Sequence, residues 1–221
     1  MTTENTRVKP VSSIVAEDGS VRLRVPRPRR QRSDRRSEIL QTLATLLQNP
    51  NCDRITTALI AKRLDVSEAV LYRCFPSKAE MFDGLITFVE TSILEIFAKI
   101  RDDGQLQPLT RVQHMVSVLL EFADANPGLT RVMTGQALMK EDPRLTERIV
   151  RLTDTFESWI RQAYKESILA GQMPADFNAS GRANLVMSWV VGRWLRFVLT
   201  GFKARPNGVS PVALAPFFSK D

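Results

Sequence analysis

The sequence predicts an all-α fold, with an N-terminal three-helix head of the helix-turn-helix type and a C-terminal helical body that forms a dimeric bundle. Apolar residues recur at helical spacing along most of the chain from residue 33 onward. No segment alternates apolar and polar residues for long enough to indicate a strand. The composition, with 43% apolar and 25% charged residues, is typical of an ordinary globular protein.

Residues 1–32 are expected to form a flexible basic arm. Pro10, Gly19 and Pro26 interrupt this segment, and periodic hydrophobicity is weak within it. Arginine crowds the stretch 22–36, and the whole chain has a formal net charge of +7. A basic arm beside a fold favours a polyanionic partner, although a solvated tail that only aids solubility is the alternative.

The residue types argue against several functional classes. With only Cys52, Cys74 and His114, the chain can build neither a disulfide framework nor a zinc cluster, and it has little acid-base repertoire near neutral pH. There is no nucleophile elbow or phosphate-binding glycine loop, so we expect no catalytic residues, metal or cofactor. No apolar run reaches the ~18 residues of a membrane span, which favours a reducing cytoplasm.

The first helix of the head is expected to begin after Asp34, a good N-cap. It ends at the Asn-Pro-Asn turn at 49–51. Its apolar residues have helical spacing and should face the core: Ile39, Leu40, Leu43, Leu46 and Leu47.

Two short helices around a tight turn follow. Thr56 caps a helix that runs to Arg63, and residues 64–66 form the turn. Ser67 caps the second helix, which Pro76 stops. This supersecondary unit binds DNA, so residues 33–78 are predicted to be a DNA-binding domain that reads duplex DNA.

Residues 79–221 are expected to form a helical dimerisation and partner-binding regulatory domain. A capping box at 77–80 opens a long helix whose apolar side runs to Ile100. Four further helices and a final apolar segment are expected over 109–124, 129–139, 143–170, 185–202 and 209–218.

The segment 185–202 predicts dimerisation. It is apolar on more than one side, and a helix of that kind needs burial on two faces, which a partner subunit supplies. Trp189, Trp194 and Val198 are the candidates for the dimer interface. The alternative is that the tryptophans line a drug pocket.

In a helix-turn-helix, the second short helix lies in the major groove with its N-terminal residues toward the base edges. Ala69 is placed to touch a thymine methyl group, and Glu68 either accepts from a cytosine amino group or faces solvent. Hydroxyls and cations around this helix would hold phosphates, with simple solvation as the alternative for each. The DNA-binding candidates are Thr56, Thr57, Ser67, Glu68, Ala69, Tyr72, Arg73 and Lys78.

Three ordered pieces of the head carry a family resemblance. They are Ile55-Thr56-Thr57, Leu64-Asp65-Val66-Ser67 and Leu71-Tyr72-Arg73-Cys74-Phe75-Pro76-Ser77-Lys78. Together they resemble the DNA-binding head of the TetR family. Asp65 stands where the family usually has glycine, and aspartate tolerates a left-handed turn better than most residues. Cys74 replaces a usual histidine, which removes a polar donor toward the phosphates and leaves a small buried thiol as the expectation.

Further segments extend the resemblance to the nucleoid occlusion factors, a branch of this family, over residues 32–206. The segments are 75–78, 81–83, 126–131, 134–135, 196–198 and 202–206. The resemblance implies a cytoplasmic, nucleoid-associated homodimer that binds specific chromosomal sites, engages the tubulin-like division protein FtsZ and blocks septum assembly over the nucleoid. It implies no small-molecule ligand.

Phe88 and Asn126 match positions that the resemblance assigns to FtsZ binding. Ala125 and Ile96 depart from it, because basic residues are found at those positions in the family. Phe88 also lies in an apolar stripe and is open to a core role, and Asn126 before Pro-Gly is open to a helix-ending role.

An ordinary TetR-type transcriptional repressor, released from its operator by a small-molecule ligand, is the alternative function. The two hypotheses share the head and differ in the body. A repressor should have a sizeable, mostly apolar cavity with a few polar anchors, whereas a division regulator can have a filled body and an exposed partner groove.

Overall fold

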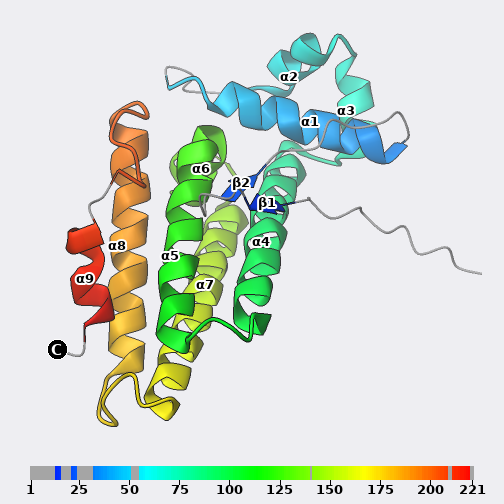
Figure 1. Cartoon of the computed structure of the whole chain (residues 1–221). Coiled ribbons are helices and arrows are strands. Elements are labelled where there is room, and N and C mark those ends of the chain that lie inside the picture. The colour runs from blue at the N-terminus through cyan, green and yellow to red at the C-terminus, as the bar shows by residue number, and fades with distance from the viewer. Residues whose placement is uncertain are drawn as a thin grey trace, which may run out of the picture.

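The computed structural model describes residues 13–15, 21–23, 32–50, 55–139, 141–208 and 211–219. Figure 1 shows a small head lying across one end of a bundle of longer helices, which confirms the all-α class. The helices are α1 (Arg32–Leu47), α2 (Thr57–Leu64), α3 (Glu68–Cys74), α4 (Lys78–Asp102), α5 (Pro108–Ala125), α6 (Pro127–Met133), the 3₁₀ helix η1 (Gln136–Leu138), α7 (Pro143–Leu169), α8 (Ala179–Leu199) and α9 (Pro211–Phe218).

One short ribbon departs from the expectation of no strands. β1 (Ser13–Val15) and β2 (Val21–Leu23) pair antiparallel, with Ser13 opposite Leu23. Strands of three residues are too short to give an alternation signal, which is why the sequence did not predict them. The rest of the arm, with most of its arginines, lies outside the described residues, and so does Cys52. The expected flexibility of the arm therefore stays a prediction.

The head is built as its apolar spacing predicts. Ile39 and Leu43 of α1 are fully buried and pack with Ile60 of α2 and Leu71 of α3 in the same core. The helix begins at Arg32, two residues before the expected cap. Helix ends are the least certain part of any prediction from spacing, and the buried face is unchanged.

Arg131 joins the head to the body. Its side chain is only 5% exposed, and its Nη1 donates to the carbonyls of Leu47 at 3.2 Å and Asn49 at 3.0 Å. The last carbonyls of a helix have no partner within that helix, so α6 supplies a charged donor to the C-terminal end of α1. The Nε of the same guanidinium donates to Gln136 at 2.6 Å, which holds its plane in position.

The expected helix over 129–139 is wrong in extent, because a break divides it into α6 and η1. Gly135 between them has a φ of 73°, a left-handed conformation that an α-helix cannot contain. α6 also begins earlier than expected, at Pro127, whose fixed φ suits the first turn of a helix.

The body is a bundle of long helices packed around an apolar core. Trp194 of α8 is fully buried, and its indole Nε1 donates to the carbonyl of Leu119 on α5 at 3.1 Å. α8 begins at Ala179, earlier than expected, where the side chain of Asn178 accepts from the Gly181 amide. The short helix α9 lies against α8 (Figure 1), and the buried Tyr164 hydroxyl donates to the Phe217 carbonyl at 2.6 Å.

Gly128 is predicted to be essential to the joint between α6 and α1. A Cβ at this position would lie 2.1 Å from the Ala44 carbonyl oxygen, so we expect Gly128→Ala to lower the free energy of unfolding by about 2 kcal/mol or more. Denaturant unfolding at fixed protein concentration measures this. Gly104→Ala is the matched control, because its Cβ would meet nothing within 4 Å. Equal stability of the two variants would contradict the packing.

Candidate nucleic-acid interface

The N-terminal residues of α3 form an exposed surface at the head. Ser67, Glu68 and Ala69 are all exposed, as is Tyr72 one turn later. Ser67 occupies the N-cap position, but its hydroxyl makes no capping hydrogen bond, contrary to the expectation that it caps the helix. Thr56 does cap α2, because its Oγ1 accepts from the Leu59 amide at 3.2 Å.

The turn between α2 and α3 has a left-handed residue at its start. Asp65 adopts φ 54° and ψ 50°, and its amide donates to the Ala61 and Lys62 carbonyls. A residue other than glycine is strained in this conformation, but aspartate is among those that tolerate it best. The turn therefore keeps its shape without the usual glycine.

Three side chains link α2 to α3 across this turn. The Thr57 hydroxyl donates to Glu68 Oε2 at 2.5 Å, and the Tyr72 hydroxyl lies 3.5 Å from Thr57 Oγ1. The sequence pattern alone leaves Glu68 either reading a base or facing solvent. The structure instead gives this carboxylate a partner within the head, so in the free protein Glu68 positions the two helices.

Arg36 is a residue of this surface that the sequence did not single out. Its guanidinium lies 4.0 Å from the centre of the Phe75 ring and donates to the carbonyl of Cys74. In the sequence it ends a run of arginines that continues from the arm, whereas in the structure α1 carries it beside the end of α3. A cation therefore lies next to Cys74, where the usual histidine is missing. The Cys74 thiol is half-buried rather than fully buried.

Lys78, the first residue of α4, lies at the junction of the head and the body. Ser77 caps this helix by accepting from the Glu80 amide at 3.2 Å. The Lys78 ammonium forms an ion pair with Glu141, which precedes α7, and lies 5.6 Å from the centre of the Phe82 ring. The sequence did not predict Glu141 as a partner of Lys78, because the two residues are 63 positions apart and no periodic pattern relates them.

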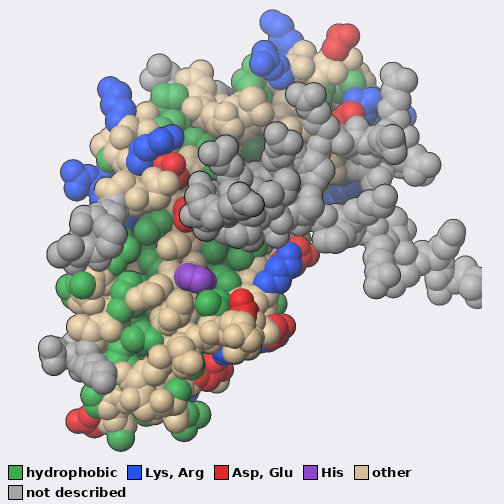
Figure 2. Space-filling model, in the orientation of Figure 1, with side chains coloured by type: hydrophobic (Ala, Val, Ile, Leu, Met, Phe, Trp, Pro, Cys, Tyr) green, Lys and Arg blue, Asp and Glu red, His purple; other side chains and the backbone are tan. Residues whose placement is uncertain are grey.

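Charge is distributed unevenly over the molecule. Figure 2 shows lysine and arginine side chains gathered toward the head end, and hydrophobic side chains on the visible face of the body. Lys62 and Arg63 in the last turn of α2 and Arg73 in the last turn of α3 contribute cations to the head. A basic surface around an exposed helix N-terminus suits a polyanion such as DNA.

The two expected partner-binding residues lie on the body. Phe88 is half-buried on α4 and packs in part against the core. Asn126 lies between α5 and α6, where its Nδ2 donates to the Phe122 carbonyl at 2.8 Å. Of the two departures from the family pattern, Ala125 is exposed, but Ile96 is only 8% exposed and belongs to the core.

The expected dimer residues lie largely inside their own subunit. Trp194 and Val198 are 0% and 5% exposed, and the half-buried Trp189 packs against Phe217 of α9 at 5.2 Å between ring centres. Side chains buried within one subunit offer no surface to another. The exposed apolar face of α8 is instead formed by Leu185, Leu195 and Leu199.

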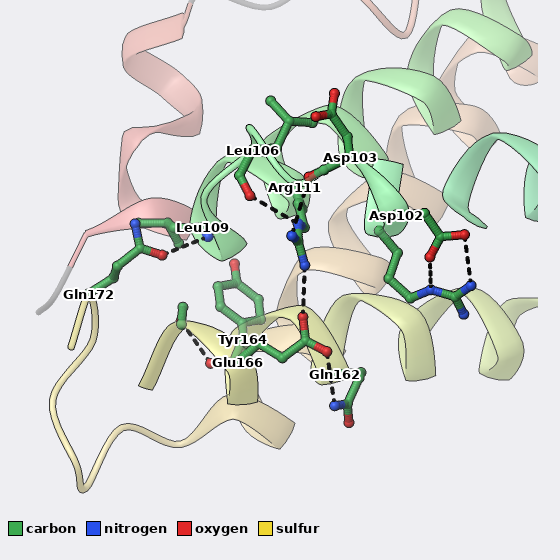
Figure 3. Close-up of polar contacts among 11 residues, drawn as sticks. Asp102, Asp103, Leu106, Leu109, Arg111, Gln162, Tyr164, Glu166 and Gln172 are labelled. Carbon is green, nitrogen blue, oxygen red and sulfur yellow. Dashed lines mark hydrogen bonds and ion pairs between the residues drawn. The ribbon is translucent and has the colours of Figure 1, made fainter. Parts of the chain in front are cut away.

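A hollow lies at the end of the body away from the head, and its size and lining bear on the ligand-binding alternative. It has a volume of about 250 Å³ and its lining includes Arg101, Arg111, Trp159 and Glu166. Arg111 and Glu166 form an ion pair of 3.2 Å, and Figure 3 shows these two side chains joined. Ligand pockets are usually about 300–1,000 Å³ and mostly apolar, so this open, charged hollow is not the chamber expected of an inducible repressor.

Metal binding and membrane insertion are two further functions on which the described residues bear. Among them, no group of three or more histidine, cysteine, aspartate or glutamate side chains could hold a metal ion. No helix in the described ranges has the length and hydropathy needed to cross a membrane.

Two family models match the chain. Residues 39–85 match the bacterial regulatory proteins of the tetR family, and residues 106–215 match a tetracyclin repressor-like, C-terminal domain of the SlmA-like type. The first match contains the helix-turn-helix, and the second contains most of the body.

Relatives of known function are similar over nearly their whole length. The nucleoid occlusion factor SlmA of Idiomarina loihiensis is 45% identical over 177 residues, which is 80% of this chain and 90% of the relative. That of Aliivibrio fischeri is 44% identical over 178 residues, covering 80% and 90%. Among solved structures, the regulatory protein TetR from Rhodobacter sphaeroides has a TM-score of 0.64 at 17% identity, covers 83% of this chain and 97% of its own, and shows the fold alone.

The exposed start of α3 predicts which substitutions alter DNA sequence preference. We expect Ala69→Gln to change the ratio of affinities for a selected and a scrambled duplex by about tenfold, since a groove-facing side chain contacts base edges. Arg73→Ala should weaken binding to both duplexes by a similar factor and reduce the salt slope by about 0.9. Fluorescence anisotropy across a salt series measures both effects. A parallel loss on both duplexes for both variants would refute the assignment.

Proposed function

The chain belongs to the TetR family of bacterial regulatory proteins, in its SlmA group, and from that premise we propose how it acts on DNA and on a partner. It is a DNA-binding nucleoid occlusion factor. The proposal is that a homodimer binds specific chromosomal sites and, when DNA-bound, engages FtsZ and stops the division septum from assembling over the nucleoid. The family consists of DNA-binding regulators and not of enzymes.

The observation that carries this function is the extent of the similarity. Identity of 45% over 177 residues includes the body as well as the helix-turn-helix, and the body is where TetR-like proteins usually differ. A DNA-reading head alone would leave the purpose of DNA binding open. The proposed location is the cytoplasm, on the nucleoid, because the target of the head is chromosomal DNA.

The proposed DNA contacts lie on the exposed side of α3 and its neighbours. Ser67 and Ala69 face the base edges, while Thr56, Thr57, Tyr72, Arg73 and Lys78 hold the phosphate backbone. Glu68 joins them by fixing Thr57 through the 2.5 Å hydrogen bond. In support, the hydroxyl of Ser67 is not engaged in a capping bond and its side chain is exposed.

The proposed FtsZ-binding surface includes Phe88 and Asn126. Phe88 keeps part of its ring outside the core, as a partner-binding residue must. Asn126 ends α5 and starts α6, so it sits next to the helix whose Arg131 holds the head. Ile96 is excluded from this surface by burial, and the exposed Ala125 remains beside it.

The proposed dimer interface is the exposed face of α8. Leu185, Leu195 and Leu199 are 56%, 41% and 69% exposed, a large apolar exposure for one helix. Gly192 lies on the same face, and a Cβ there would meet nothing within 4 Å, so a second helix has room to approach closely. Trp189 and Trp194 contribute to this interface only indirectly, because they pack α8 onto the rest of its own subunit.

The proposed partner predicts a DNA-dependent effect on FtsZ polymers. With GTP, the protein together with a duplex selected from a random library should reduce the amount of FtsZ polymer that sediments. Phe88→Ala should raise the protein concentration needed by about tenfold or more, as expected for an aromatic contact at an interface. Arg151→Ala, an exposed position on α7, is the control and should have no effect. No change in sedimented polymer at any ratio would rule out the FtsZ proposal.

The proposed interface predicts that Leu195→Arg dissociates the dimer. A guanidinium placed in an apolar interface is desolvated without a partner, and we expect the dimer Kd to rise about 100-fold or more. Sedimentation velocity over a concentration series measures this. Leu169→Arg introduces the same charge at a residue that is 88% exposed at the end of α7, and should leave the Kd unchanged. If the two variants dimerise equally well, α8 is not the interface.

A further inference from the structure

The ion pair between Lys78 and Glu141 connects two parts of the molecule that have different proposed tasks. Lys78 is the first residue of α4, directly after the head, and Glu141 lies in the segment between η1 and α7. Their side chains are only 21% and 17% exposed. A pair that is largely shielded from water is less weakened by solvent than a surface pair.

The Glu141 carboxylate occupies a position that suits a DNA phosphate. It lies on the ammonium of the residue that opens a 25-residue helix, and the first amides of such a helix carry partial positive charge. Carboxylate and phosphate oxygens accept from an ammonium in the same way. Lys78 cannot neutralise both anions fully, because the two would lie side by side and repel each other.

We propose that Glu141 is an internal competitor for the DNA phosphate at Lys78. DNA binding exchanges the carboxylate for a phosphate, which releases Glu141 and the segment that carries it. The inference rests on the proposed DNA-binding function and adds to it a residue of the body that lowers the affinity of the head. The body thereby acquires a different surface when the head is occupied.

The contacts on either side limit what the exchange releases. The start of α7 stays attached to α4, because Arg148 pairs with Glu90 at 2.6 Å and with Asp83 at 3.4 Å. On the other side, Arg131 of α6 stays on the carbonyls of α1. Inside the segment 134–141, Gln136 accepts from Arg131 Nε at 2.6 Å and Leu138 is 2% exposed, so η1 stays in place. The change is therefore confined to the C-terminal side of η1, around Glu141.

A double-mutant cycle tests the competition. Glu141→Gln removes the charge with almost no change of volume, and we expect it to raise the affinity for the selected duplex about three- to tenfold. In a Lys78→Ala background the same substitution should have no effect, since there is no ammonium to compete for. Glu147→Gln removes an equal charge from a residue of α7 that is 70% exposed, and should leave the affinity unchanged.

Two results of this cycle would overturn the inference. One is an unchanged affinity for Glu141→Gln; the other is an equal gain in both backgrounds, which would be a general effect of charge. Wild-type binding to the selected duplex over a scrambled one is measured in the same experiment. If the wild-type protein shows no preference for the selected duplex, the proposed function is refuted. If it shows that preference but the cycle gives either of the two results above, only the competition is refuted.

Hydrogen exchange gives a second readout that does not depend on affinity. In the segment on the C-terminal side of η1, the amides of Met139 and Glu141 should exchange faster when wild-type protein is saturated with the selected duplex, because the ion pair with Lys78 is lost. Glu141→Gln should show the faster exchange without DNA. Slower exchange of this segment in the complex would overturn the inference, and a thermal melt verifies that the variant is folded.

Discussion

The C-terminal end of α1 is where the structure is held together. Its last carbonyls have no partner in the helix, and Arg131 of α6 supplies the donors from a site that is 5% exposed. Gly128 brings the backbone of α6 against Ala44 closely enough for this contact to form. The orientation of the head on the body, and hence the spacing of two heads in the proposed dimer, depends on this joint.

In the head, one set of residues maintains the shape and another set is exposed for DNA recognition. Asp65 sets the turn in a left-handed conformation, and the hydrogen bond from Thr57 to Glu68 ties the two short helices together. These contacts leave the start of α3 exposed, with the hydroxyl of Ser67 outside the capping network. A rigid scaffold that presents a few exposed groups is what sequence readout in the major groove requires.

The body has the features of a scaffold for protein contacts more than those of a ligand chamber. Trp194 fills the space between α8 and α5, and the hollow beside Arg111 and Glu166 is open and charged. The apolar surface lies outside, on Leu195 and its neighbours on α8. The proposed exchange at the ion pair between Lys78 and Glu141 gives such a body a route by which to respond to DNA through its contacts with the head.

The sequence by itself determined the helical class and the helix-turn-helix, because helical spacing and caps are local signals. It placed the exposed start of α3 in the DNA-binding surface for the same reason. Only the tertiary structure decided that Trp194 is core, that Glu68 bonds Thr57, and that Glu141 pairs with Lys78 across 63 positions. Those contacts join residues that no periodicity relates, so they exist only once the helices are packed.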